Sequence, residues 1–164
     1  MVNNKYLMES HLETVRLEAK TDLEKVKAQA LWAGIQPGMR VADVCCGPGK
    51  TTKCLNHLVQ PGGSTVGVDI SEERIKHANK INSMKEIDFV CADIRMPLNK
   101  LGLFDFVWIR FALEYFREES FEIVKNLSEL VKKEGILCLI DLDYNCLSHF
   151  GLPSKIDKTI GKIV

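Results

Sequence analysis

Short apolar runs alternate with stretches of helical length through most of this 164-residue chain, from Met39 onward. The runs are apolar on both faces, which is typical of strands in a parallel sheet that is covered on both sides. Parallel strands also need crossover connections, and the helical stretches between the runs supply them. The pattern therefore predicts a doubly wound α/β domain, with a mainly parallel sheet of about five strands and helices on both faces.

The expected elements follow from these runs and from local helix signals. We expect strands at Arg40–Cys45, Ser64–Asp69, Ile87–Cys91, Phe104–Ile109 and Gly135–Leu142. We expect helices at Lys50–Val59, Glu72–Ser83 and Glu118–Lys132. Ser71 is a suitable N-cap for the second of these helices, and Gly135 is a suitable C-cap for the third.

Shorter segments flank this core and divide the chain into residues 1–36, 37–143 and 144–164. A polar helix is expected first, from the helical spacing of Leu12, Val15 and Ala19. Thr21–Glu24 is a capping box for a second helix, which should run to Ala33 and stop at Gly34. The tail has room for one short helix, at Pro153–Val164.

Composition excludes several classes of function. The chain has 22 Lys and Arg residues against 22 Asp and Glu residues, and without a basic block nucleic-acid binding has little support. The balanced charge makes work on a small molecule the expected function. Neither a membrane-spanning run nor a signal-peptide pattern is found, so we expect a cytoplasmic protein. The six cysteines form no C-x-x-C pair, which predicts reduced, buried thiols and no metal site.

Glycines and carboxylates follow the first three expected strands. The first strand runs into the turn Cys45–Gly49, where glycine lets a ligand approach the backbone, and then into a helix whose first amides can face an anion. Asp69 ends the second strand and Asp93 follows the third. Ligands of open parallel sheets bind at the carboxyl ends of the strands. The two carboxylates suit a nucleoside, one at the ribose and one at the adenine amino group.

Three nucleotide-binding motifs compete for the turn. A P-loop needs G-x-x-x-x-G-K-[ST], and Gly49–Thr51 supplies its end, but Val44 stands at its first glycine. The dinucleotide fingerprint G-x-G-x-x-G has Thr52 at its third glycine, and Asp43 would bring a carboxylate close to a bound pyrophosphate. An acidic residue followed by G-x-G-x-G fits best.

This third motif resembles motif I of the class I S-adenosylmethionine-dependent methyltransferases, and four more motifs of that family follow in order. The matching residues are Asp43 with Gly47 and Gly49, Asp69, Asp93, Phe104–Trp108 and Lys132–Leu137. The likeness covers about Pro37 to Asp143. It implies the strand order 3-2-1-4-5 and a cofactor-binding core.

The resemblance also implies the cofactor, S-adenosylmethionine, with S-adenosylhomocysteine (SAH) as product, and transfer of the methyl group to a small-molecule acceptor by in-line displacement. The cofactor-binding residues that it implies are Asp43, Cys45, Cys46, Gly47, Gly49, Thr51, Thr52, Asp69, Ile70, Asp93, Ile94 and Arg110. No nucleophilic residue is needed, because a sulfonium is a good leaving group and the protein mainly orients two partners. Candidates for a catalytic role are Arg110, Glu114, Tyr115 and His149.

Several alternatives and expectations complete this interpretation. Cys45 replaces the first glycine of motif I, so a catalytically silent cofactor-binding or regulatory module is an alternative function; Gly49–Thr51 leaves a P-loop-like nucleotide enzyme as a second. The N-P-P-[YF] signature of relatives that methylate nucleic-acid amino groups is absent after the fourth strand, which favours a small-molecule acceptor. His57 and His77 are expected on solvated helix surfaces.

The ends of the chain carry two further expectations. The segment before the first strand, with Tyr6, Met8 and Arg16, is expected to act as a lid over the cofactor, as in similar methyltransferases. The residues after the fifth strand are too few for the helix and antiparallel hairpin that complete the family fold, so we expect a truncated methyltransferase without part of its acceptor pocket. Ile136–Ile140 would then be an open sheet edge, covered by a homodimer partner or by the tail.

Overall fold

The computed structural model describes residues 11–116 and 118–141. Its strands are β1 (Arg40–Val44), β2 (Ser64–Asp69), β3 (Ile87–Cys91), β4 (Phe104–Arg110) and β5 (Val131–Ile140). Its helices are α1 (His11–Lys20), α2 (Leu23–Trp32), α3 (Lys50–Leu58), α4 (Glu72–Ile81) and α5 (Ser120–Ser128), with 3-10 turns η1 (Asn99–Leu101) and η2 (Leu113–Tyr115). The expected tail helix lies outside the described residues, as do Tyr6 and Met8.

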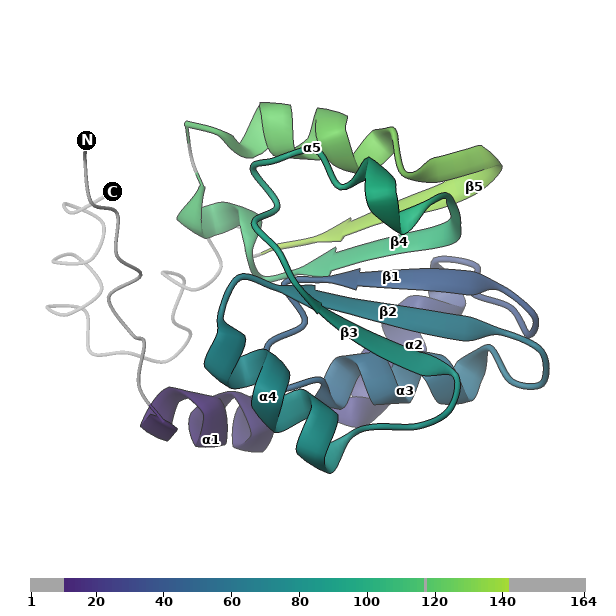
Figure 1. Cartoon of the computed structure of the whole chain (residues 1–164). Coiled ribbons are helices and arrows are strands. Elements are labelled where there is room, and N and C mark those ends of the chain that lie inside the picture. The colour runs from purple at the N-terminus through teal and green to yellow at the C-terminus, as the bar shows by residue number, and fades with distance from the viewer. Residues whose placement is uncertain (1–10, 117, 142–164) are drawn as a thin grey trace, which may run out of the picture.

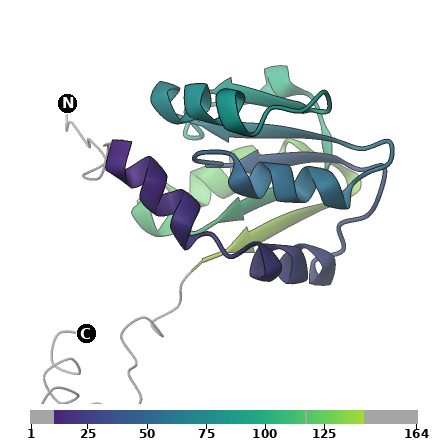
Figure 2. The ribbon, with the colours of Figure 1, turned by 90° about the horizontal axis from the view of Figure 1, so that it is seen from below.

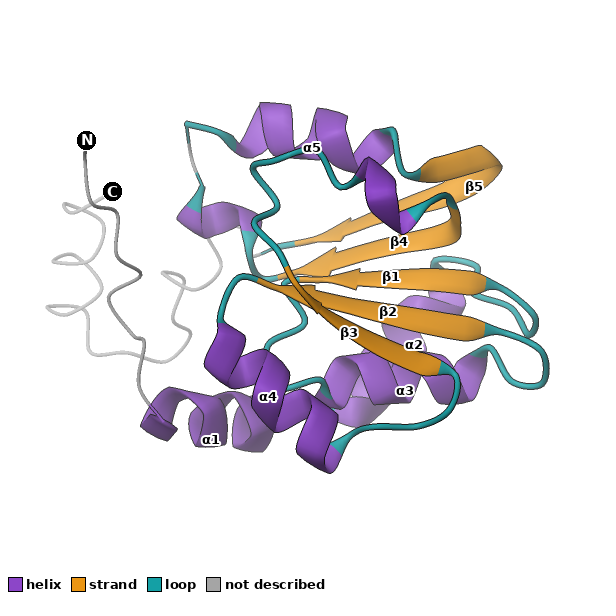
Figure 3. Cartoon of the chain, in the orientation of Figure 1, coloured by secondary structure: helices purple, strands orange, loops and turns teal. Residues whose placement is uncertain are grey.

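The strands form one sheet in the order β3-β2-β1-β4-β5, and every neighbouring pair is parallel (Figure 1). Helices α2, α3 and α4 lie on one side of the sheet, and α5 lies on the other (Figure 3). The doubly wound fold and the predicted strand order are therefore confirmed. Within the described ranges, no helix is long and apolar enough to cross a membrane.

Each side of the sheet has its own hydrophobic core, and β4 contributes to both. Phe106 and Trp108 are fully buried toward α2 and α3, where Leu55 packs with them. Val107 and Ile109 are buried toward α5. Successive residues of a strand point to opposite faces, so a run that is apolar throughout belongs at the centre of a covered sheet.

The helix expected at Glu118–Lys132 is wrong at its end, because α5 stops at Ser128 and β5 begins at Val131. Gly135 is not a helix C-cap but lies within β5. Phe104 pairs with Val131 and Phe106 with Ile136, so β5 holds extra residues at this bulge. A Cβ on Gly135 would come within 2.8 Å of the Val131 side chain, so the bulge requires glycine here.

The predicted capping box is also wrong by one residue. The N-cap of α2 is Asp22, whose carboxylate accepts hydrogen bonds from the amides of Glu24 and Lys25. Thr21 instead donates its hydroxyl hydrogen bond to Leu17 O, 2.7 Å away. The threonine directly follows α1, and closing that helix uses the hydroxyl that a cap for α2 would need.

Among the described residues, β5 pairs only with β4, and one edge of β5 carries no strand. Leu139 is 43% exposed. The homodimer through this edge stays a prediction.

Candidate functional site

Three carboxylates occupy the carboxyl ends of neighbouring strands. Asp43 lies in β1, Asp69 is the last residue of β2, and Asp93 follows β3. Because β1 pairs with both β2 and β4, the chain order reverses beside Asp43, where α/β sheets bind their ligands. The arrowheads in Figure 1 point toward this edge, and α1 lies beside it both in that view and in the view from below (Figure 2).

The turn between β1 and α3 is fixed by backbone hydrogen bonds. Cys46 N donates to Val68 O at 2.9 Å, and Gly47 N donates to Asp69 Oδ2 at 2.8 Å. At Gly49, φ is +86° and a Cβ would lie 2.7 Å from the Phe89 ring, so only glycine fits. The turn is therefore tied to β2 by the chain's own hydrogen bonds.

Two residues that are not glycine have left-handed backbone conformations at this edge. Cys45 has φ +60° directly after β1, and Phe111 has φ +53° directly after β4. A side chain in this region costs about 1–2 kcal/mol, because its Cβ crowds the following carbonyl. Such strain is concentrated at functional sites. Cys45 stands at the first glycine position of the motif, and the backbone there therefore keeps a conformation that glycine favours.

Asp43 is 2% exposed and accepts a hydrogen bond from Thr52 Oγ1 at 2.6 Å. Burial raises the pKa of Asp43 to about 7, an effect that the Thr52 hydrogen bond opposes; the charge of Asp69 adds to the rise and that of Arg110 opposes it. The buried carboxylate therefore lacks sufficient compensation for a full negative charge. A cation bound beside it would supply that compensation.

Asp69 is 4% exposed, and backbone amides hold both of its oxygens. Gly47 N donates to Oδ2 at 2.8 Å and Ser71 N donates to Oδ1 at 2.9 Å. Arg74 approaches Oδ1 to 3.7 Å. The carboxylate is therefore oriented by the backbone of two segments.

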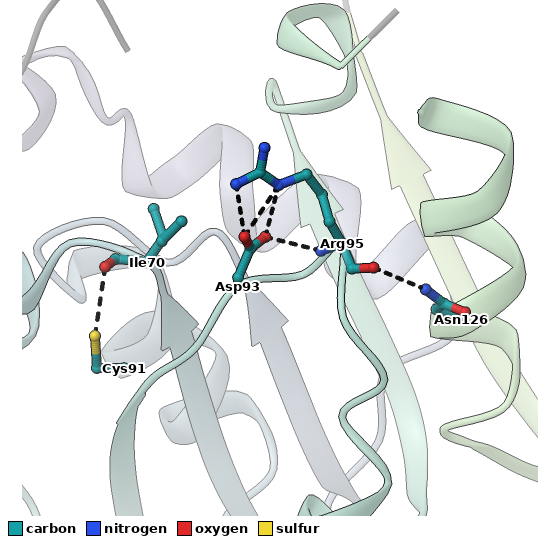
Figure 4. A network of polar contacts seen from close by, with 5 residues as sticks. All are labelled: Ile70, Cys91, Asp93, Arg95 and Asn126. Atoms are coloured by element: carbon teal, nitrogen blue, oxygen red, sulfur yellow. Dashed lines mark hydrogen bonds and ion pairs between the residues drawn. The ribbon is translucent and has the colours of Figure 1, made fainter. Parts of the chain in front are cut away.

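Asp93 is held by a side chain, as Figure 4 shows. Arg95 Nε lies 3.0 Å from both carboxylate oxygens, and Arg95 Nη2 lies 2.6 Å from Oδ2. Arg95 N also donates to Oδ1 at 3.0 Å. Hydrogen bonds from Arg95, against some desolvation, lower the pKa of Asp93. The sequence analysis missed Arg95, although its place two residues after an aspartate permits such a pair.

The other predicted site residues are distributed around this edge. Thr51 lies in the first turn of α3, and Ile70 is 53% exposed just after β2. Ile94 is 4% exposed and packs in the core toward α5, so its side chain points into the protein interior. Arg110 ends β4, and its Nε donates to Gln29 Oε1 at 3.0 Å.

The residues proposed for catalysis differ in how far the structure brings them together. Glu114 and Tyr115 lie in η2, after β4, and Tyr115 is 52% exposed. Glu114 N donates to Asp141 Oδ2 at 3.1 Å, so Asp141 connects this turn to the end of β5. His149 lies outside the described residues.

Helix α1 is attached to the site by contacts that sequence reasoning missed. Lys50 Nζ donates to Glu18 O at 2.6 Å and to Thr21 O at 3.0 Å, at the carboxyl end of α1. His77 Nε2 lies 3.1 Å from Glu18 Oε1. His77 is therefore only partly solvated, because Glu18 of α1 contacts its ring. Lys50, the lysine of the P-loop alternative, binds helix carbonyls here.

The cysteines are free thiols in the described part of the chain, and two of them, Cys46 and Cys138, are buried. Cys91 is exposed, contrary to the prediction, because β3 is an edge strand. Cys146 lies outside the described residues. Within residues 11–116 and 118–141, no group of His, Cys, Asp and Glu residues could hold a metal ion.

Comparison with known proteins agrees with this geometry. The methyltransferase domain family matches residues 41–135. A demethylmenaquinone methyltransferase of Staphylococcus aureus is 31% identical over 119 residues, which are 71% of this chain and 48% of the relative. The chain thus spans about half the length of the curated relatives it matches.

Two solved structures show the same fold. A plantazolicin methyltransferase in complex with SAH aligns over 91% of this chain and 60% of its own, with 20% identity and a TM-score of 0.69. A SAM-dependent methyltransferase from Aquifex aeolicus aligns over 82% of this chain and 78% of its own, with 22% identity and a TM-score of 0.60. Because the family matches more than half of the residues of this chain, the chain belongs to the methyltransferase domain family.

Proposed function

We propose that this chain binds S-adenosylmethionine at the carboxyl ends of β1, β2 and β3 and supports methyl transfer to a small molecule. The observation that carries this proposal is the placement of Asp43, Asp69 and Asp93 around the Cys45–Gly49 turn. S-Adenosylmethionine has hydrogen-bond donors on its ribose and adenine and positive charges on its ammonium and sulfonium groups. A row of carboxylates complements both features.

Each carboxylate has a role in this proposal. Asp69, oriented by two backbone amides, accepts hydrogen bonds from the ribose hydroxyls with its remaining lone pairs. Asp93 faces the adenine amino group. Asp43 lies beside the positively charged methionine end, and a cation there favours its ionised form. Binding should therefore tighten as the pH rises through about 7, where Asp43 loses its proton.

The surroundings of the site support an apolar acceptor. Large apolar side chains are exposed after the carboxyl ends of three strands. The exposed fractions are 53% for Ile70, 62% for Met96 and 52% for Tyr115. Relatives named demethylmenaquinone methyltransferases suggest a quinone precursor or a similar aromatic metabolite as the acceptor. The bound cofactor supplies the methyl group as a sulfonium; the protein orients the acceptor in line with it and excludes water. In this proposal α1, held by Lys50, is the lid.

Calorimetric titration with S-adenosylmethionine, SAH, ATP and NAD tests the binding step. We expect binding of the first two only. Binding of ATP alone would favour the P-loop alternative and overturn the proposal.

A transfer assay with methyl-labelled S-adenosylmethionine then tests the reaction on demethylated quinols, transfer RNA and a protein mixture. We expect label in the quinol class. Cofactor binding without label in any acceptor would favour the silent module, and label in RNA or protein would contradict the small-molecule acceptor.

A further inference from the structure

Three N–H groups of Arg95 occupy most of the hydrogen-bonding capacity of the Asp93 carboxylate. A carboxylate offers about four lone-pair positions. Arg95 N donates to Oδ1 at 3.0 Å, Arg95 Nη2 donates to Oδ2 at 2.6 Å, and the single Nε hydrogen is shared between the two oxygens, each 3.0 Å from Nε (Figure 4). An amino group of a ligand therefore competes with the guanidinium for the Asp93 oxygens.

The backbone around this pair is fixed, whereas the guanidinium has room to leave. Ile94, between the two residues, is 4% exposed and packs in the core toward α5. Asn126 of α5 donates its side-chain amide to Arg95 O at 3.4 Å. The Arg95 side chain is 40% exposed. Displacement thus requires a change of side-chain rotamers and no rearrangement of the loop.

We propose that Arg95 competes with the adenine amino group of the cofactor for the Asp93 carboxylate. The free-energy cost of displacing Arg95 then lowers both the affinity for the cofactor and the preference for a 6-amino purine. This inference rests on the proposed cofactor site. Arg95 is a specificity-determining residue in this account and takes no part in the methyl transfer.

The specificity follows from the chemistry of the guanidinium, which only donates hydrogen bonds. A 6-amino group also donates, so it competes with Arg95 for the carboxylate. A 6-oxo group accepts, so it can bond to Arg95 while the ion pair with Asp93 stays in place. The wild-type protein should therefore discriminate weakly between SAH and S-inosylhomocysteine, its 6-oxo analogue.

The test is calorimetry of both ligands with wild-type protein and the Arg95→Met variant, which keeps a long apolar side chain. We expect Arg95→Met to bind SAH about two- to fivefold more tightly, the range for release of a partly exposed ion pair. It should bind S-inosylhomocysteine equally or less tightly, so the affinity ratio rises in favour of SAH. The Asp93→Asn background should abolish the gain, because no carboxylate remains to be released.

Lys76→Met is the matched control, because Lys76 forms an exposed pair with Glu72 at 2.9 Å and the substitution removes the same charge. It should leave the affinity ratio unchanged. Equal affinities and ratios in wild type and Arg95→Met, or weaker SAH binding by Arg95→Met, would overturn the role of Arg95. Such a result would leave the proposed cofactor site standing. Absence of SAH binding in every variant would overturn the proposed cofactor site and this inference with it.

Discussion

The carboxyl ends of β2 and β3 hold their acidic residues in different ways. Asp69, after β2, is buried and bonded to the amides of Gly47 and Ser71. Asp93, after β3, is bonded by Arg95, whose side chain is partly exposed. Backbone donors cannot leave without a loop rearrangement, whereas a guanidinium can rotate into water. The comparison separates a preformed part of the site from a part that must open.

The largest effect is expected at the end of β1, where Asp43 is buried with too little compensation. In the folded protein burial raises the pKa of Asp43 to about 7, from an ordinary value of 3.8. Between these pH values the folded protein keeps a proton that the unfolded chain has lost, so the free energy of unfolding falls as the pH rises. Asp43→Asn removes this loss. Relative to wild type, the free energy of unfolding of the variant should rise by up to about 4 kcal/mol between pH 4 and pH 7. Above pH 7 this difference should stay constant.

Denaturant unfolding across pH 3 to 8 measures this difference, with Asp105→Asn as a control of opposite sign. Partial burial raises the pKa of Asp105, but hydrogen bonds from Lys132 and Arg40 N outweigh this effect and lower it. Asp105 therefore stabilises the fold as the pH rises toward 4, and Asp105→Asn should lose stability over that lower range. A flat difference for Asp43→Asn would mean that Asp43 is ionised in the folded protein.

The second effect compares Asp69 and Asp93 directly. Asp69→Ala should weaken SAH binding by about 1.5–3 kcal/mol, or one to two decades, through loss of charge-assisted hydrogen bonds. Asp93→Ala should cost less, because the wild-type carboxylate must first release Arg95. Calorimetry gives both values, and Asp88→Ala, an exposed change on β3, serves as the control. A larger loss for Asp93→Ala would reverse the comparison.

The third effect concerns the strained turn after β1. Cys45→Gly should stabilise the fold by up to about 1 kcal/mol, because relief of the left-handed strain exceeds the entropy that glycine gains in the unfolded chain. Cys46→Gly is the matched control; Cys46 is buried without a positive φ and should lose stability. Thermal unfolding compares the two. Destabilisation by Cys45→Gly would show that the thiol's packing outweighs its backbone strain.

The smallest effect concerns the attachment of α1. Hydrogen exchange of residues 11–20 should slow when SAH binds, if α1 acts as a lid. Lys50→Met should make local opening of α1 easier by about 0.3–1 kcal/mol, since a cation at a helix carboxyl end stabilises it by this amount. Lys53→Met, one turn further along α3, is the control. Unchanged exchange on ligand binding would contradict the lid.

The sequence predicted the sheet well because its signals are local. Continuous apolar runs such as Phe106–Ile109 reflect burial on both faces, and β1 to β4 lie within one residue of their predicted bounds. Prediction was less accurate where one local signal served two structures. Thr21 matches a capping motif for α2, but its hydroxyl bonds to the end of α1. The residues before Gly135 match the pattern of a helix end, but they form the bulge of β5.

The sequence by itself determined the fold, the family and the acidic residues at the strand ends, because strand periodicity and motif spacing are written along the chain. Only the tertiary structure decided what holds each acid. The contacts of Lys50 with Glu18 O and of Asp69 with Gly47 join residues far apart in sequence. The pKa of Asp43 likewise depends on burial beneath elements that no local pattern describes. Charge and desolvation act through space, and their outcome is fixed only when the sheet and its helices are packed.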